Sequence, residues 1–189
     1  KYPKVGEKNS DVSVWVYEFA RGKAVKADIG DLTEMYVPRL KWTQDASQLC
    51  IYKLNRHQNE LKLYLLDTKN YKSSILYEEK NQYYVSIDDN LTFLKDKRHF
   101  IWLSEKEGYN QVYLMGMDGK QKVKLTDGQY EVTNFYGVDE KNKKVYFQAV
   151  DGGPLRKSVF SVNLDGKKLT NLTPAKDGTS SAQFSSTFD

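Results

Sequence analysis

Residues 112–126 read VYLMGMDGKQKVKLT, and this stretch decides the fold. Val112 and Leu114 alternate with the residues between them, and this period of two is typical of a half-buried strand. The pair Asp118-Gly119 has the composition of a tight hairpin turn with positive φ. A short basic strand and the pair Leu125-Thr126 follow. The stretch therefore predicts two antiparallel strands joined by a hairpin.

The same phrase recurs along the chain. Its copies start at Val16, Leu63, Val112 and Val159, which are 47, 49 and 47 residues apart. The last copy also continues into Asp-Gly, at 165–166, and into Leu-Thr, at 172–173. A fixed period of this length indicates a repeat architecture.

Two more strands are expected upstream of each complete copy. The nearer one is predicted at Gln48–Asn55, Arg98–Ser104 and Lys143–Val150, and the farther one carries a central aromatic residue, Trp42, Phe93 or Phe135. Four strands in about 47 residues are typical of one β-propeller blade. We therefore expect an all-β fragment of a β-propeller, with about three complete four-stranded blades and partial blades at both ends. The predicted ranges are 1–35 (end of a blade), 36–80, 81–128 and 129–178 (complete blades), and 179–189 (start of the next blade).

Other segments show the same alternation. Val12-Val14-Val16 and Val145-Phe147-Ala149 alternate with period two. Residues His57–Asp67 have good helix formers, but Leu61, Leu63 and Leu65 share one face only in a strand. We expect a strand there, and core positions for the recurrent tyrosines and tryptophans.

A closed propeller needs at least four blades, so three blades leave open sheet faces. The chain also begins without Met, in the middle of the repeat. Both features favour a piece of a longer protein.

Composition excludes several classes of function. The 189 residues are 39% hydrophobic with a mean hydropathy of -0.70, and no window approaches the length of an apolar membrane span. The N-terminal residues do not form a signal peptide. The net charge is +4, but the basic residues are scattered among acidic ones, so no nucleic-acid partner is expected. Cys50 stands alone in an apolar stretch and is expected in the core, with neither a disulfide nor a metal site. No cofactor is expected.

Four phrases resemble, in the same order, the propeller of dipeptidyl peptidase IV-like enzymes in the prolyl oligopeptidase family of serine peptidases. They are YPKVG at 2–6 with Asn9, LNRHQN at 54–59 with Leu61 and Leu63, FIWLSEKEGY at 100–109, and LTDGQYEV at 125–132. The resemblance covers nearly the whole chain, and we expect a bacterial source.

The resemblance implies a serine exopeptidase that releases X-Pro or X-Ala dipeptides from peptide N-termini. Its Ser-His-Asp triad would lie in a C-terminal α/β-hydrolase domain, which is absent from this chain. No Gly-x-Ser-x-Gly elbow occurs here, and Ser180 and Ser181 do not fit its spacing. His57 and His99 are expected to be surface residues of a blade. We therefore expect no catalytic residue in this chain, which should be catalytically silent.

Five residues of the phrases are expected to be structural rather than substrate-binding. Gly108 can supply a positive φ in the turn after the second strand of a blade, and Ser104 and Glu105 can accept hydrogen bonds from loop amides. Arg56 and Asn59 occupy the corresponding turn one blade earlier.

The family binds the substrate's ammonium group with two adjacent glutamates of the propeller. By position this pair belongs before residue 1, so Glu78-Glu79 is expected to be an exposed strand end instead. The stretch 83–89 corresponds to one that borders the active-site cavity in the family. Within it we expect Ile87 and Asp88 to line the substrate-facing rim.

An alternative is a non-enzymatic propeller that binds a protein or a glycan. The repeat supports both alternatives equally, and only the four phrases favour the enzyme. The resemblance further implies peptide substrates, an exported location in the periplasm or at the cell surface, and room for a homodimer of the parent protein.

Overall fold

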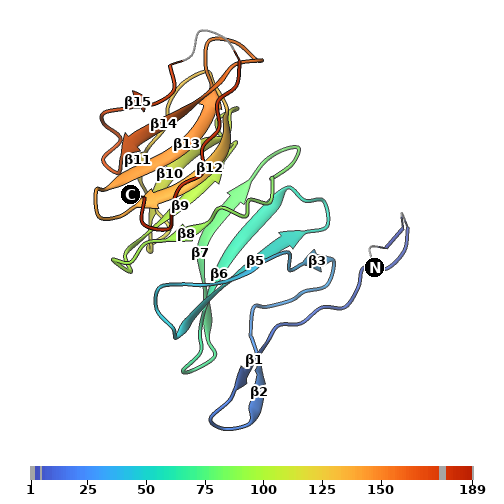
Figure 1. Cartoon of the computed structure of the whole chain (residues 1–189). Coiled ribbons are helices and arrows are strands. Elements are labelled where there is room, and N and C mark those ends of the chain that lie inside the picture. The colour runs from blue at the N-terminus through green and yellow to red at the C-terminus, as the bar shows by residue number, and fades with distance from the viewer. Residues whose placement is uncertain (1–2, 5, 175–177, 189) are drawn as a thin grey trace. The chain divides into compact units, whose positions relative to one another are not determined.

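The computed structural model describes residues 3–4, 6–174 and 178–188, and it divides the chain into two compact units, Lys1–Ile87 and Asp88–Asp189. All pairs of named strands are antiparallel, and the described residues form no α-helix (Figure 1). Hence none of the described segments is a helix that is long and apolar enough to cross a membrane.

The first unit contains a hairpin and a larger sheet. The hairpin consists of β1 (Trp15–Glu18) and β2 (Lys23–Lys26). In the larger sheet β5 pairs with β6, β6 pairs with β7, and the short strands β3 and β4 both pair with β5. We call it the β4–β7 sheet; its strands are β3 (Met35–Tyr36), β4 (Leu40–Trp42), β5 (Gln48–Asn55), β6 (Glu60–Asp67) and β7 (Ser73–Lys80).

The hairpin packs on one face of this sheet. Register places Leu49 opposite Leu66 and Ile51 opposite Tyr64, so these side chains share a face. Val14, Ala27 and Ile29 from the hairpin segment join them in one buried cluster. The opposite face is buried as well, and its buried members on β5 and β6 are Cys50, Tyr52, Leu54, Leu61 and Leu63.

Cys50 lies in the core as predicted, with no exposed surface. Its burial raises the pKa of the thiol to about 12. The thiol is therefore protonated and unreactive at neutral pH.

The second unit contains two four-stranded sheets. The β8–β11 sheet has the order β11-β10-β9-β8, and the β12–β15 sheet has the order β12-β13-β14-β15. Their strands are β8 (Thr92–Phe93), β9 (His99–Ser104), β10 (Gln111–Gly116), β11 (Gln121–Lys124), β12 (Val132–Asp139), β13 (Lys144–Val150), β14 (Lys157–Asn163) and β15 (Thr170–Asn171).

These two sheets face each other across a shared apolar core (Figure 1). Ile101, Leu103, Val112 and Leu114 come from the β8–β11 sheet. Their partners from the β12–β15 sheet include Val132, Phe135, Val145, Phe147, Ala149 and Val162. Alternation with period two thus predicted the core face of both sheets correctly.

The predicted hairpins form, with one correction to their geometry. Gly119 and Gly166 adopt φ values of 74° and 78°. Asp118 and Asp165 do not adopt positive φ. Instead, their carboxylates accept hydrogen bonds from the backbone N–H groups two residues further on. The aspartate therefore stabilises the turn through its side chain, while the glycine alone supplies the left-handed backbone.

The strand predictions at Gln48–Asn55, Arg98–Ser104, Lys143–Val150 and within His57–Asp67 are confirmed, with ends shifted by three residues or fewer. The strand expected from Val12 is wrong at its start, because β1 begins at Trp15 and Val12 is exposed. A core position for Trp42 is also wrong, since 51% of its surface is exposed, whereas Phe93 and Phe135 are buried.

The fold class is the expected all-β propeller fragment, while the division of the chain into blade ranges stays a prediction. Within 178–188 the structure has one isolated parallel bridge, between Lys157 and Thr179. The segment then crosses the β12–β15 sheet on the face away from the shared core, where Phe188 stacks on Tyr146 at 5.4 Å.

Candidate functional site

In each four-stranded repeat, two kinds of connection lie at the same end of the strands. One is the turn between the second and third strands, and the other is the link from the fourth strand to the next segment of the chain, since antiparallel strands return every second connection to one edge. We call this the connection edge. In the first unit it comprises 55–59 and 81–87; in the second it comprises 88–91, 105–110, 125–131, 151–156, 172–174 and 178–180. Each of the five predicted motif residues and each predicted rim residue lies, within its own unit, on the connection edge or at the strand end that leads into it.

In the first unit, backbone hydrogen bonds join the turn to the link. The Asn81 N–H donates to the Asn59 carbonyl at 3.0 Å, and the Val85 N–H donates to the Gln58 carbonyl at 2.8 Å. Val85 is buried. The link that leads to Ile87 is therefore fixed against the turn.

Arg56 joins three segments. Its Nη2 donates to the Glu7 carbonyl at 2.7 Å, its Nη1 donates to the Glu34 carboxylate at 2.5 Å, and its backbone N–H donates to the Glu34 carbonyl. The hydrogen bond to Glu34 raises the pKa of the Arg56 guanidinium, and the pKa of the Glu34 carboxyl is lowered by the same bond. Arg56 thus connects the phrase at 54–59 to the segment that carries the first phrase. Tyr2 and Val5 of that first phrase lie outside the described residues.

Asn59 closes the turn together with Asn55. The Asn55 Nδ2 donates to Asn59 Oδ1 at 2.8 Å, while Asn55 Oδ1 accepts from the backbone N–H groups of Asn59 and Glu60. Gln58 adopts a φ of 58° within this turn. Asn55 was missed by sequence reasoning, although its place at a strand end before a turn is typical of a residue that bonds the local backbone.

The corresponding turn of the second unit has related chemistry. Ser104 is buried and its hydroxyl accepts from the Lys106 N–H at 3.1 Å. The Glu105 carbonyl, rather than its carboxylate, accepts from the Gly108 N–H at 2.8 Å. Gly108 has a φ of 98°, in the region that favours glycine.

A repeated threonine contact supports the links of the second unit. Thr126 Oγ1 accepts from the Val112 N–H at 2.9 Å, and Thr173 Oγ1 accepts from the Val159 N–H at the same distance. In the first case the buried Gln111 side chain extends the contact. Its Oε1 accepts from Thr126, and its Nε2 donates to the carbonyl oxygens of Gly128 and Tyr130.

The recurring Leu-Thr pairs were visible in the sequence, but their role was not. Each threonine continues the ladder beyond the last strand residue, because its hydroxyl replaces a backbone carbonyl as the acceptor. Gln111 could not have been found in this way, since nothing in its local pattern distinguishes it from a surface glutamine.

Ile87 and Asp88 both lie half-buried in the link between β7 and β8. Ile87 ends the first unit and Asp88 begins the second. Asp88 Oδ1 accepts from both the backbone N–H and the side-chain amide of Asn90, at 3.0 and 2.7 Å. The carboxylate therefore helps to order its own loop.

The Glu78-Glu79 pair differs from the expectation in one residue. Glu78 is exposed and forms ion pairs with Lys62 and Lys80 at 3.3 and 3.1 Å. Glu79 is buried, contrary to the expectation of an exposed pair, and accepts a hydrogen bond from Tyr77 at 3.0 Å. Glu79 lies in the regularly paired part of β7, on the C-terminal side of the bulge at which Leu63 pairs with Tyr77 but Tyr64 pairs with Ile75. Register puts Glu79 opposite buried Leu61.

The two histidines lie in a turn and at the start of a strand. His57 is exposed in the turn before β6. His99 starts β9, and its Nδ1 lies 2.6 Å from the Asp96 carboxylate, which also accepts the backbone N–H groups of Arg98 and His99. Ser180 contributes only backbone groups, to Gln148 and Lys157.

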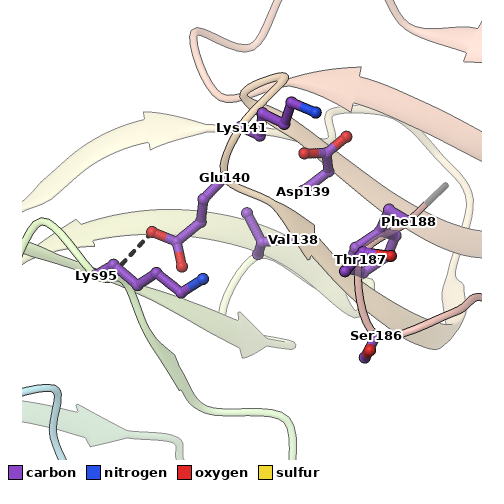
Figure 2. A pocket seen from close by; sticks show the side chains of 8 residues that line it. All are labelled: Lys95, Val138, Asp139, Glu140, Lys141, Ser186, Thr187 and Phe188. Atoms are coloured by element: carbon purple, nitrogen blue, oxygen red, sulfur yellow. Dashed lines mark hydrogen bonds between the residues drawn. The ribbon is translucent and has the colours of Figure 1, made fainter.

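A pocket of about 260 Å³ opens at the edge opposite the connection edge of the second unit. Figure 2 shows Lys95 and Glu140 on one side and the segment 186–188 on the other. The Glu140 carboxylate accepts from the Lys95 N–H at 2.8 Å, and Asp139 accepts from Asn142. The Asp139 carboxylate closes its own turn, and the Glu140 carboxylate joins that turn to the segment at Lys95.

The comparisons with known proteins agree with this geometry. The sequence model of the family described as "Dipeptidyl peptidase IV (DPP IV) N-terminal region" matches residues 1–189. A dipeptidyl peptidase 4 of Trichophyton rubrum is 25% identical over 185 residues, which cover 94% of this chain and 24% of that protein. One of Arthroderma otae is 24% identical over 196 residues, with 100% and 25% covered.

The crystal structure of Porphyromonas gingivalis dipeptidyl peptidase 4 is similar with a TM-score of 0.91 and 33% identity, over 100% of this chain and 26% of that chain. The chain thus spans about a quarter of the length of these relatives. Because the family model covers every residue, the chain belongs to the family of the dipeptidyl peptidase IV N-terminal region.

Proposed function

We propose that this chain is part of the N-terminal β-propeller of a serine exopeptidase that releases X-Pro or X-Ala dipeptides from peptide N-termini. The propeller screens substrate access and shapes the site, while the catalytic triad is supplied by a hydrolase domain outside residues 1–189. The observation that carries the proposal is the family match over the whole chain. The relatives named dipeptidyl peptidase 4 support the activity.

The contacts at the connection edge support a structural role for the propeller residues, with catalysis supplied by the hydrolase domain. Its loops are fixed by bonds of the Arg56, Asn55, Ser104 and Gln111 side chains to backbone groups, and the Asn59 side chain accepts a hydrogen bond from Asn55. These side chains hold the edge in shape and leave substrate binding to others. A rigid frame positions loops precisely at low entropic cost. In our proposal Arg56, Asn59, Ser104, Glu105 and Gly108 are structural residues of the propeller.

Ile87 and Asp88 then form the substrate-facing rim. Val85 anchors the link two residues earlier, and Asp88 is ordered by Asn90, so the position of the rim is defined from both ends. Ile87 offers apolar surface to side chains of longer peptides, and Asp88 offers charge. Both would act on the residues beyond the released dipeptide.

Three further properties of the parent protein belong to the same proposal. Its location is exported, in the periplasm or at the cell surface; its source is bacterial; and it has room to form a homodimer. The relatives include both fungal and bacterial proteins.

The test uses the complete protein and a pair of peptides. It should cleave Gly-Pro-Leu-Phe after the proline, and it should not cleave the same peptide with an acetylated N-terminus, because the exopeptidase needs the free ammonium group. Equal cleavage of both peptides would contradict the proposed specificity. A complete protein with no hydrolase domain and no turnover would favour the binding-platform alternative instead.

A further inference from the structure

Opposite charges gather at the two ends of the strands in the second unit. The connection edge there carries seven acidic residues against two basic ones. At the other end lie the turns between the first and second strands and between the third and fourth strands, in the ranges 94–98, 116–122, 139–144 and 163–168. These ranges, which we call the basic edge, hold ten lysine and arginine residues against five aspartate and glutamate residues. Nine of the ten basic residues are exposed.

Contacts between the turns make the basic edge one continuous surface. Three hydrogen bonds join the four turns in series. They run from the Met117 N–H to the Arg98 carbonyl at 2.8 Å, from the Lys95 N–H to the Glu140 carboxylate at 2.8 Å, and from the Leu164 N–H to the Lys143 carbonyl at 2.9 Å. The fold thus brings together lysines that are scattered along the sequence.

The acidic side chains of the basic edge are engaged by the turns themselves. All five carboxylates accept hydrogen bonds from N–H groups of their own turn or of a neighbouring turn, and they belong to Asp96, Asp118, Asp139, Glu140 and Asp165. Within the described residues, Lys122 is the one basic side chain of this edge that forms an ion pair, with Asp118 at 2.7 Å. Positive charge therefore dominates the electrostatic field at this edge.

Three lysines of the basic edge occupy backbone positions that suit glycine or asparagine. Lys97, Lys143 and Lys168 have φ values of 57°, 55° and 58°. A left-handed backbone costs free energy for lysine, whereas glycine and asparagine adopt it readily. Among the described residues, every lysine with a positive φ lies on this edge. Lysine is thus placed in these turns at a cost in local stability, a pattern typical of a functional surface.

The arrangement of these charges fits a planar partner better than a linear one. The pocket at this edge is lined by Asp139 and Glu140 as well as by Lys95 and Lys141, so the basic side chains do not converge in a groove (Figure 2). Nine of the ten basic residues are lysines, which carry a compact charge and lack the planar fork used for bidentate recognition. The basic edge also contains no aromatic residue on which a nucleic-acid base could stack.

We propose that the basic edge binds the anionic phosphate headgroups of a lipid bilayer. The attraction is electrostatic, because each lysine close to an anionic membrane surface contributes to it and salt screens it. The acidic connection edge of the same unit, which includes Asp88, then faces away from the bilayer. This orientation leaves the substrate-facing rim open to dissolved peptides, a consequence that rests on the proposed function.

The test measures how the complete protein sediments with large lipid vesicles. It should bind vesicles that contain phosphatidylglycerol at least tenfold more tightly than vesicles of phosphatidylcholine alone, and high salt should release it. Combining Lys97→Asn, Lys143→Asn and Lys168→Asn should weaken this binding at least tenfold. The variant should melt no lower than the unmodified protein, because asparagine accepts the left-handed backbone.

A matched control removes the same charge elsewhere. The combination of Lys4→Gln, Lys8→Gln and Lys26→Gln, at exposed lysines of the first unit, should bind the anionic vesicles as the unmodified protein does. Equal affinities of the two triple variants, or equal binding to both kinds of vesicle, would overturn the proposal. So would binding of dextran sulfate, but not of vesicles, through the lysines of the basic edge, because the partner would then be a linear polyanion. Peptidase activity does not enter this measurement, so its outcome is separate from that of the proposed function.

Discussion

Arg56 donates a hydrogen bond to the carbonyl oxygen of Glu7 at 2.7 Å, across 49 residues of sequence. The other guanidinium nitrogen binds Glu34, so one side chain joins the N-terminal segment, the hairpin exit and the turn after β5. A lysine lacks the planar fork that lets Arg56 reach the two acceptors from separate nitrogens.

We predict that Arg56→Lys lowers the melting temperature by a few degrees and that Arg56→Ala lowers it further. The lost contacts are the forked bonds to Glu7 and Glu34. Thermal unfolding followed by circular dichroism measures the effect. Arg98→Ala is the matched control, since only the backbone of Arg98 bonds to Asp96. Equal melting temperatures for Arg56→Ala and the control would contradict the role of Arg56.

The Arg56–Glu34 pair also predicts a pH dependence. The pKa of Glu34 is lowered from 4.5 in the folded state, chiefly by its hydrogen bond with Arg56. A lowered folded pKa gives stabilisation that is complete above the unfolded pKa and is lost as the pH falls through the folded pKa. The difference in melting temperature between the unmodified protein and Glu34→Gln should therefore be larger at pH 7 than at pH 3. A difference in melting temperature that is larger at pH 3 than at pH 7 would contradict the stabilising role of the ionised Glu34.

Thr126→Val should destabilise the second unit by about 1–3 kcal/mol. The change leaves the buried Val112 N–H without its acceptor and the Gln111 side-chain oxygen without its donor. Urea unfolding measures this loss. The same change at Thr173 should cost less, since that threonine is more exposed and has, among the described residues, no buried glutamine partner corresponding to Gln111. A smaller loss at Thr126 than at Thr173 would count against the proposed contact.

Gly137→Ala should destabilise the protein by roughly 3 kcal/mol, because two costs combine. Gly137 has a φ of 136°, and an added Cβ would lie 2.7 Å from the Phe188 ring. Gly108→Ala should cost only about 1 kcal/mol, since its φ of 98° is strained for alanine but nothing lies within 4 Å. In the Gly137→Ala background, Phe188→Ala should restore part of the loss. If it does not, residues 186–188 do not pack on the β12–β15 sheet in solution.

Replacing Ile87 and Asp88 by serine in the complete enzyme should lower kcat/KM for peptides of five or more residues by roughly tenfold, the effect of about 1.4 kcal/mol. Cleavage of a Gly-Pro chromogenic substrate should be unchanged, because its leaving group does not extend to the rim. Lys120→Ser, at a turn on the opposite edge, is the control. Unchanged kcat/KM for all substrates would show that neither Ile87 nor Asp88 belongs to the substrate-facing rim.

The strands and the core could be predicted because period two and the 47-residue repeat each fix them independently. Val145, Phe147 and Ala149 illustrate this, since their alternation alone places them in the core. The bonds that hold the connection edge could not be predicted. Arg56 and Glu34 are 22 residues apart, and Gln111 and Thr126 are 15 apart, so only the folded backbone brings them together.

Two errors arise from contacts that the local sequence does not show. Glu79 is buried because its register puts it opposite buried Leu61, and Trp42 is exposed because the hairpin segment packs on Leu49 and Ile51 but does not cover Trp42. Neither the pairing register nor an uncovered face changes the local pattern of hydrophobic residues. The local pattern of hydrophobic residues therefore predicts which strands form, but not which residues pack against each strand.

The most direct measurement compares the complete protein with the 189-residue chain on a Gly-Pro chromogenic substrate, with and without a serine-directed inhibitor. The account predicts turnover by the complete protein that the inhibitor abolishes, and no turnover by the chain alone. Inhibitor-sensitive turnover by the chain alone, or an inactive complete protein, would contradict it.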